Sequence, residues 1–219
     1  MLTGLDLHIT EGERVGLIGA NGAGKTTLFL TICGILSAKQ GEIYVFGRKI
    51  QVGRFNPDIG LVFQNPVDQL FCPTVRDDVA FGPENLGLSP LEVNLRVQQA
   101  LAVTGTSHLI DRIPHHLSGG EKSMVAIASV LSLQPKFILY DEPSANLDLQ
   151  ARRRLINFLQ TSPQTILVAS HDLEMILEVC DRVLVLNHGT IVADGQPLEI
   201  MKNRELMTNN GLEVPKSLG

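Results

Sequence analysis

The sequence predicts an α/β fold with a mostly parallel sheet, and three observations carry that prediction. A glycine-rich segment at residues 19–27 lies between the apolar runs Val15–Ile18 and Leu28–Leu30, in the order strand, loop and helix. Apolar strand patterns and helical patterns then alternate between residues 137 and 186. The stretch 66–134 is helical in character. Such alternation places helices on both faces of a mostly parallel sheet.

Each element follows from a local pattern. Period-two alternation or a short apolar run predicts strands at Leu5–Ile9, Val15–Ile18, Gly41–Gly47, Ile59–Phe63, Phe137–Tyr140, Thr165–Ala169 and Val183–Leu186. Capping residues and helical periodicity predict helices opening at Pro73–Val75, after Ser89–Pro90, from Ser118 to about Leu133, at Leu149–Leu159 and at Leu173–Cys180. From Pro197 onward, we expect two short helices.

These elements predict a single domain over residues 1–219. Residues 1–65 and 135–195 form the core, residues 66–134 form a helical insert, and residues 196–219 form a short helical tail. A length of 219 residues with 44% hydrophobic content is enough to bury a sizeable core.

Composition excludes some classes of function. A net charge of −5 without a Lys/Arg block argues against nucleic acid as the main partner. Widely spaced Cys33, Cys72 and Cys180 favour buried free thiols in a reducing compartment, for which the cytoplasm is the simplest choice. The longest apolar-rich stretch, Met124–Leu133, is too short to span a bilayer, so any membrane function is expected to come from partner chains.

The glycine-rich segment fits the pattern G-x-x-x-x-G-K-[ST] of a phosphate loop. We therefore expect a P-loop NTPase fold. In such a loop, backbone N–H groups and the N-terminus of the next helix hold phosphate oxygens, Lys25 reaches the β and γ phosphates, and the Thr26 hydroxyl binds Mg²⁺. An ordinary glycine-rich turn is the alternative. The predicted nucleotide-binding residues are Gly19, Ala20, Asn21, Gly22, Ala23, Gly24, Lys25, Thr26 and Thr27.

Further motifs stand in a fixed order after this loop. Alone, the Ser-Gly-Gly of Leu117–Glu121 is a helix cap and turn. Here it ends about 20 residues before an apolar strand that runs into Asp-Glu. The remaining motifs are Val62–Pro66 with Gln64, Tyr140–Pro143, Ser144–Asp148, and Ala169–Asp172 with His171. This order resembles that of the ATP-binding-cassette (ABC) ATPases over essentially the whole chain.

The resemblance implies ATP and Mg²⁺ as ligands and assigns roles to single residues. Glu142 would polarise the attacking water, His171 would bind the γ-phosphate, and Gln64 would touch both Mg²⁺ and that water. The metal ligands would be Thr26, Gln64 and Asp141. Without the family pattern, an Asp-Glu pair at a strand end is more often a solvated corner. A lone Gln is usually surface, and a strand-end His is often a cap.

The resemblance also implies a second ATPase subunit, either a copy or a paralogue, in a head-to-tail dimer. Each nucleotide would lie between one subunit's phosphate loop and the segment Ser118, Gly119 and Gly120 of the other, here called the signature segment. Asp148 would cross the same interface.

A finer resemblance is to the energy-coupling-factor importers, and within them to the cobalt and nickel uptake ATPases. It rests on Phe63–Phe71, Pro73–Val75, Asp78–Leu88 and His115–Gly120. It implies transmembrane partners docking near Val67, Leu70 and Phe71, and a peripheral place at the cytoplasmic face of the membrane. The alternatives are a vitamin importer of the same branch, a soluble ABC protein without a transport role, or a nucleotide-binding scaffold without turnover.

The chain departs from the family in a few places. Glu121 and Ser123–Met124 replace residues common there, and neither change removes a phosphate ligand. Leu149 stands where proline is frequent, which we expect to matter little. No aromatic residue precedes Phe29, although the family has one that stacks on adenine. We therefore expect an antiparallel β part that is truncated at the N-terminus, and hypothesise that Met1 is an internal start.

Overall fold

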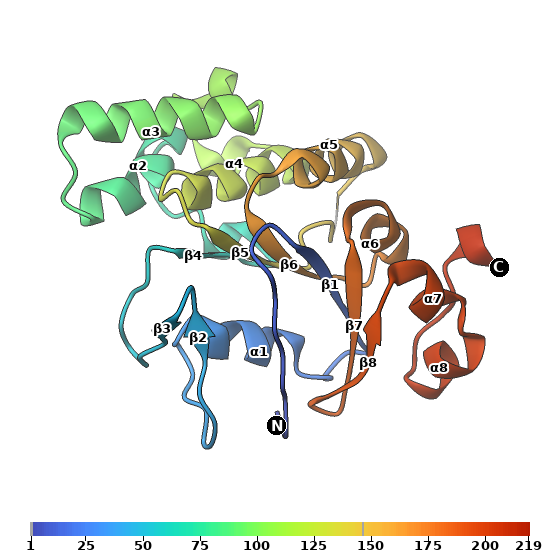
Figure 1. Cartoon of the computed structure of the whole chain (residues 1–219). Coiled ribbons are helices and arrows are strands. Elements are labelled where there is room, and N and C mark those ends of the chain that lie inside the picture. The colour runs from blue at the N-terminus through green and yellow to red at the C-terminus, as the bar shows by residue number, and fades with distance from the viewer. Residues whose placement is uncertain (1, 146) are drawn as a thin grey trace.

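The computed structural model describes residues 2–145 and 147–219. Met1 and Asn146 lie outside the described residues, and so does the hypothesis that Met1 is an internal start. A six-stranded sheet in the order β4–β5–β6–β1–β7–β8 forms the centre (Figure 1). Its strands are β1 Arg14–Ile18, β4 Ile59–Val62, β5 Phe137–Asp141, β6 Thr165–Ala169, β7 Arg182–Asn187 and β8 Thr190–Gly195. Among the described strands of this sheet, only the β7–β8 pair is antiparallel. The predicted α/β fold with a mostly parallel sheet is confirmed.

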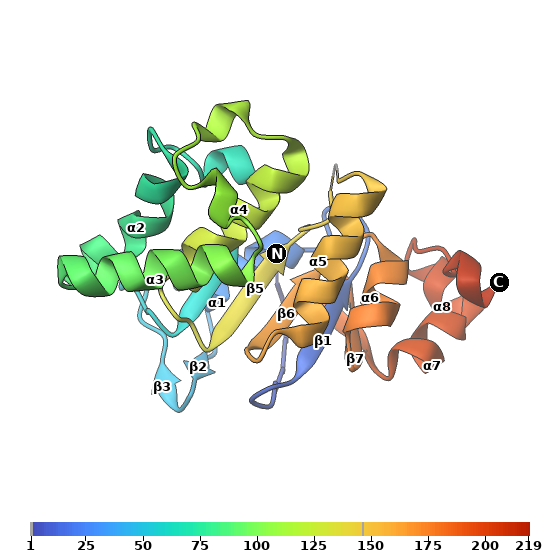
Figure 2. The ribbon, with the colours of Figure 1, turned by 90° about the horizontal axis from the view of Figure 1, so that it is seen from above.

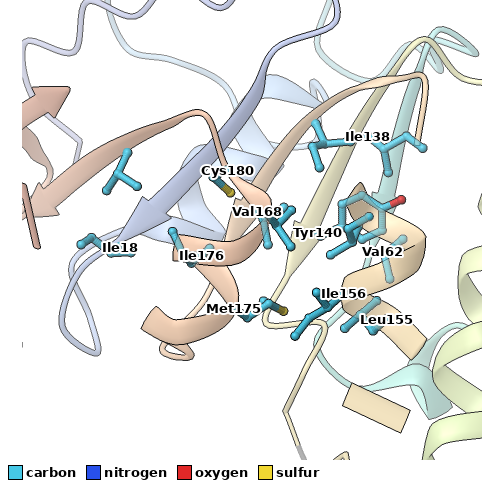
Figure 3. Packing of buried hydrophobic residues seen from close by; sticks show 14 of the residues in the cluster. Ile18, Val62, Ile138, Tyr140, Leu155, Ile156, Val168, Met175, Ile176 and Cys180 are labelled. Atoms are coloured by element: carbon cyan, nitrogen blue, oxygen red, sulfur yellow. The ribbon is translucent and has the colours of Figure 1, made fainter. Parts of the chain in front are cut away.

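Each face of the sheet carries its own apolar cluster, because successive strand residues point to opposite sides. From β5, Ile138 and Tyr140 join a cluster with residues of α4 and α5, as Figure 3 shows for the α5 side, whereas Leu139 packs with residues of α1. Full burial of an aliphatic side chain such as Ile138 or Leu139 contributes about 1.5–3 kcal/mol. The covering helices are α1 Lys25–Ile32, α4 Gly119–Leu131, α5 Leu149–Thr161 and α6 Leu173–Val179.

The helical insert contains α2 Val75–Asn85, α3 Pro90–Val103 and α4. Their first turns are capped by the side chains of Thr74, Ser89 and Ser118. The three helices share a third apolar cluster and lie together at one end of the molecule, opposite α7 and α8 (Figure 2).

Leu70 belongs to the insert's own cluster, with only 3% of its surface exposed. Its expected role as a contact for a membrane partner is therefore wrong, because the side chain cannot reach a docked chain. Val67 and Phe71 remain available, at 45% and 63% exposed.

A short hairpin forms the small antiparallel sheet. β2 Tyr44–Val45 pairs with β3 Arg48–Lys49, and the two residues between them, Phe46 and Gly47, have φ of 48° and 73°. Positive φ at both central residues is the geometry of the type I′ turn that matches strand twist. The strand predicted over Gly41–Gly47 is real but only two residues long.

The strand predicted at Leu5–Ile9 is absent from the structure. Its alternation is correct for the side chains, since Leu5, Leu7 and Ile9 are half-buried against the α1 cluster. The backbone, however, takes part in no strand ladder of the described residues. Apolar alternation therefore predicted which side faces the core, but a strand also needs a hydrogen-bonding neighbour.

The C-terminal residues fold as predicted into two short helices, α7 Pro197–Lys202 and α8 Arg204–Asn209. Met201 and Met207 bury their side chains in the α5 and α6 cluster and hold both helices on the core. All three cysteines are free, but only Cys180 is buried. No helix among the described residues has the length and apolar character needed to cross a bilayer.

Candidate functional site

The candidate residues gather at one edge of the central sheet. The phosphate loop follows β1, Asp141 and Glu142 stand at the end of β5, and His171 comes two residues after β6. β5, β6 and β1 are adjacent and parallel, so their carboxyl ends meet at this edge. In open α/β sheets, this edge is where ligands bind.

The phosphate loop leaves the first amides of α1 without an intramolecular cap. Gly24 occupies the N-cap position with φ 114° and no side-chain hydrogen bond. At Gly19, a Cβ atom would lie 2.3 Å from the carbonyl oxygen of Leu186, so only glycine fits there. Free N–H groups at a helix N-terminus attract an anion. The loop's geometry therefore fits a phosphate chain.

Lys25 is held inside this loop with 7% of its surface exposed. Its Nζ donates to the carbonyl oxygen of Gly19 at 2.8 Å, and lies 3.2 Å from Nε2 of His171. The carboxylate of Glu142 comes within 3.7 Å of the same Nζ. Burial lowers the pKa of Lys25, and the charges of Glu142 and Asp141 oppose that shift.

Thr26 and Asp141 form an oxygen pair beside the lysine. The Thr26 hydroxyl donates to Oδ2 of Asp141 at 2.8 Å. Burial raises the pKa of Asp141, against the hydrogen bond from Thr26 and the charge of Lys25. No cluster of three or more His, Cys, Asp or Glu side chains suited to a metal occurs among the described residues. The pair fits Mg²⁺, which takes few protein oxygens and completes its shell with phosphate and water.

Glu142 has one carboxylate oxygen that accepts a hydrogen bond and one that does not. Oε2 accepts the backbone N–H of His171 at 2.9 Å, while the buried Oε1 has no hydrogen-bond partner among the described residues. The backbone of Glu142 has φ 49°, a left-handed conformation that costs energy in a residue with a side chain. An orphaned acceptor on a constrained backbone suits a group that binds a water or takes its proton.

His171 is held by a contact that the sequence did not reveal. Its Nε2 lies 2.9 Å from Oδ1 of Asn21 in the phosphate loop, 150 positions earlier in the chain. Gln64 lies two residues beyond β4, which pairs with β5 so that Val62 is opposite Tyr140. It is therefore at the same edge as Asp141, with its side chain exposed.

The signature segment lies elsewhere. It begins α4, which covers the sheet face opposite to α1 (Figure 1). Ser118 caps α4 through a reciprocal pair with Glu121: the Glu121 carboxylate accepts the Ser118 N–H and hydroxyl, each at 2.8 Å. At Gly120, a Cβ atom would lie 2.5 Å from Cβ of Ala151, and Asp148 caps α5 by accepting the Ala151 N–H at 2.8 Å. One chain therefore brings the signature segment to Asp148 and not to its own phosphate loop.

The fold and the site geometry agree with the family to which the sequence is related. Residues 2–145 match the ABC transporter family, and the chain belongs to that family. The fold is that of a P-loop ABC ATPase, and the family's activity is ATP hydrolysis.

Individual relatives are similar over most of their length. A protein of Synechocystis sp. named as an ABC transporter ATP-binding protein is 55% identical, over 100% of this chain and 77% of its own. The energy-coupling factor transporter ATP-binding protein EcfA of Methanothermobacter thermautotrophicus is 44% identical, over 99% and 72%. The structure of CbiO1 from Clostridium perfringens, described as part of the ABC transporter complex CbiONQ, is 37% identical with a TM-score of 0.84, over 95% and 86%.

Proposed function

We propose that this chain is the Mg²⁺-dependent ATPase subunit of an energy-coupling-factor importer. The observation that carries the catalytic part is the buried Oε1 of Glu142, which has no hydrogen bond among the described residues and lies 3.7 Å from Nζ of Lys25 and 3.4 Å from Nε2 of His171. The family supplies ATP binding, and the similarity to EcfA and CbiO1 supports the branch.

The residues divide the work. Lys25 and the uncapped amides of α1 would hold the phosphates, and Thr26, Asp141 and Gln64 would hold Mg²⁺. When bound, the ion would supply positive charge beside the phosphate oxygens. Glu142 orients the attacking water and accepts its proton on Oε1. His171, whose Nε2 lies 2.9 Å from Oδ1 of Asn21 in this structure, would give up that contact and donate to the γ-phosphate when nucleotide is bound.

A second ATPase subunit completes the site. Ser118, Gly119 and Gly120 would face the partner's nucleotide, with Asp148 beside them. This assignment is supported by the exposed position of Ser118 at the N-terminus of α4.

Transmembrane subunits would dock on the insert near Val67 and Phe71. Phe71 also makes an edge-to-face contact with Phe81, which is 48% exposed, with ring centroids 5.0 Å apart. Two exposed aromatic rings side by side suit an apolar helix of a partner. We propose cobalt or nickel ions as the cargo, with a vitamin as the alternative, and a peripheral place at the cytoplasmic face of the membrane.

Two measurements test the proposal. The purified chain should hydrolyse ATP, and removing Mg²⁺ with a chelator should stop it.

Val67→Asp and Phe71→Asp should reduce co-purification with the membrane partners without changing ATP affinity, because each would bury a charge. Leu91→Asp is the matched control, since Leu91 is 81% exposed on α3 of the same insert. Equal co-purification of all four proteins would contradict this docking surface.

A further inference from the structure

Gln69 connects two parts of the chain that the proposed mechanism treats separately. Its Oε1 accepts the backbone N–H of Phe63 at 3.2 Å, on the residue directly before Gln64. Its Nε2 donates to the carbonyl oxygen of Ala126 at 2.7 Å and to the hydroxyl of Ser129 at 3.0 Å. Both acceptors belong to α4, the helix that begins at the signature segment.

The segment that Gln69 holds is compact. Oδ1 of Asn65 accepts the N–H of Val67 at 3.2 Å, and the Gln69 N–H donates to the carbonyl oxygen of Pro66 at 3.1 Å. Gln64 therefore sits between two pinned neighbours, Phe63 and Asn65. These hydrogen bonds give a displacement of Gln64 a path through its neighbours to the side-chain amide of Gln69.

We propose that Gln69 is a positioning residue that transmits the movement of Gln64 to α4. The idea rests on the proposed function, in which Gln64 responds to Mg²⁺ and nucleotide in one site while Ser118 serves the nucleotide of the other subunit. Because α4 is a continuous helix, a pull at Ala126 changes the direction of its N-terminus at Ser118. The Gln69 amide accepts at Oε1 and donates from Nε2, so one side chain makes both contacts, whereas an ionised carboxylate or a thioether lacks the donor.

The link predicts a loss of cooperativity and turnover without a loss of binding. In Gln69→Met and Gln69→Asn, ATP affinity should stay within about twofold, while kcat falls about 2- to 30-fold, the range found for residues that carry coupling between sites. The Hill coefficient for ATP should fall toward one. The control is Gln99→Met, the same change at an exposed glutamine on α3.

Hydrogen exchange tests the link directly and does not depend on turnover. With Mg²⁺ and a non-hydrolysable ATP analogue, wild-type protection should change in residues 63–69 and in the first turns of α4 together. In either Gln69 variant, residues 63–69 should still respond and α4 should not. A response of α4 equal to that of wild type would overturn the proposal, and so would kcat and Hill coefficient equal to those of Gln99→Met.

Failure of the proposed function gives a different result. If the wild-type chain neither binds nor hydrolyses ATP, the site assignment fails and the Gln69 proposal falls with it. If the wild type hydrolyses ATP cooperatively and both Gln69 variants do the same, only the role of Gln69 is wrong.

Discussion

The phosphate-loop site and the signature segment use charge in opposite ways. Lys25, Asp141 and Glu142 are 7%, 6% and 8% exposed, and one oxygen of Glu142 lacks a hydrogen bond within the described residues. Ser118 is exposed and fully engaged with Glu121, whose pKa is lowered by the hydrogen bonds from Ser118. The first region is incomplete by itself, whereas the second is satisfied as it stands.

This difference indicates which region binds its ligand within the chain. A buried charge without enough partners is costly, and a ligand that supplies the missing partners recovers that cost. An exposed capped helix start has no such deficit. The start of α4 is therefore suited to contact a nucleotide that is bound by another subunit.

Removing the Glu142 carboxylate should have the largest effect. Glu142→Gln should keep Mg-ATP binding but lose turnover by about 10² to 10⁴-fold, because the acceptor for the water proton is gone. ATP then persists, so the variant should elute as a dimer in size-exclusion chromatography with Mg-ATP and as a monomer without it. Hydrolysis at the wild-type rate would rule out Glu142 as the base.

The next prediction compares the ATP affinity of a variant in the phosphate loop with that of a variant in the signature segment. Lys25→Ala should weaken ATP binding to the isolated chain by about 1.5–3 kcal/mol, the value of a hydrogen bond to a charged group. Ser118→Arg should leave that affinity nearly unchanged and abolish hydrolysis, since a bulky cation obstructs closure on the partner. Calorimetry on both variants measures this. Equal loss of affinity would mean that Ser118 belongs to the same nucleotide site as Lys25.

Much of this comparison was predictable from the sequence. The phosphate loop has a local pattern of glycines and a lysine, and the buried strands are continuous apolar runs. These patterns predicted the positions of β1, β5, β6 and β7 correctly. β8 was missed because Thr190–Gly195 pairs antiparallel at the sheet edge and is only partly buried. Contacts such as Asn21 with His171, or Gln69 with Ala126, join distant positions, and neither residue carries a local pattern that names its partner.

A smaller effect concerns the stability of the signature segment. Glu121→Ala removes the acceptor for the Ser118 N–H and hydroxyl, and should cost about 1 kcal/mol, as other cap losses do. For a chain of this size, that lowers Tm by about 2–4 °C. Thermal unfolding without nucleotide measures it, with Glu121→Gln as the control that keeps an acceptor. An unchanged Tm would show that the cap contributes nothing.

In the phosphate-loop site, removal of a charge should act in the opposite direction. Burial raises the pKa of Asp141, so the folded state holds the proton to higher pH than the unfolded state, and ionisation lowers stability as pH rises. Asp141→Asn should therefore raise Tm slightly at pH 7 without nucleotide, and this gain should shrink as pH falls toward about 4. A lower Tm at pH 7 would show that Lys25 more than compensates the buried carboxylate.

The close approach of Gly120 to Ala151 has a consequence for how the sequence can change over generations. Any side chain at position 120 would occupy the volume that the Ala151 methyl group now fills. Only one of the two positions can therefore carry a side chain without displacing its neighbours. Gly120→Ala should damage the protein alone and be rescued by Ala151→Gly. Descendants of this chain should therefore exchange these residues in pairs, although 31 positions separate them.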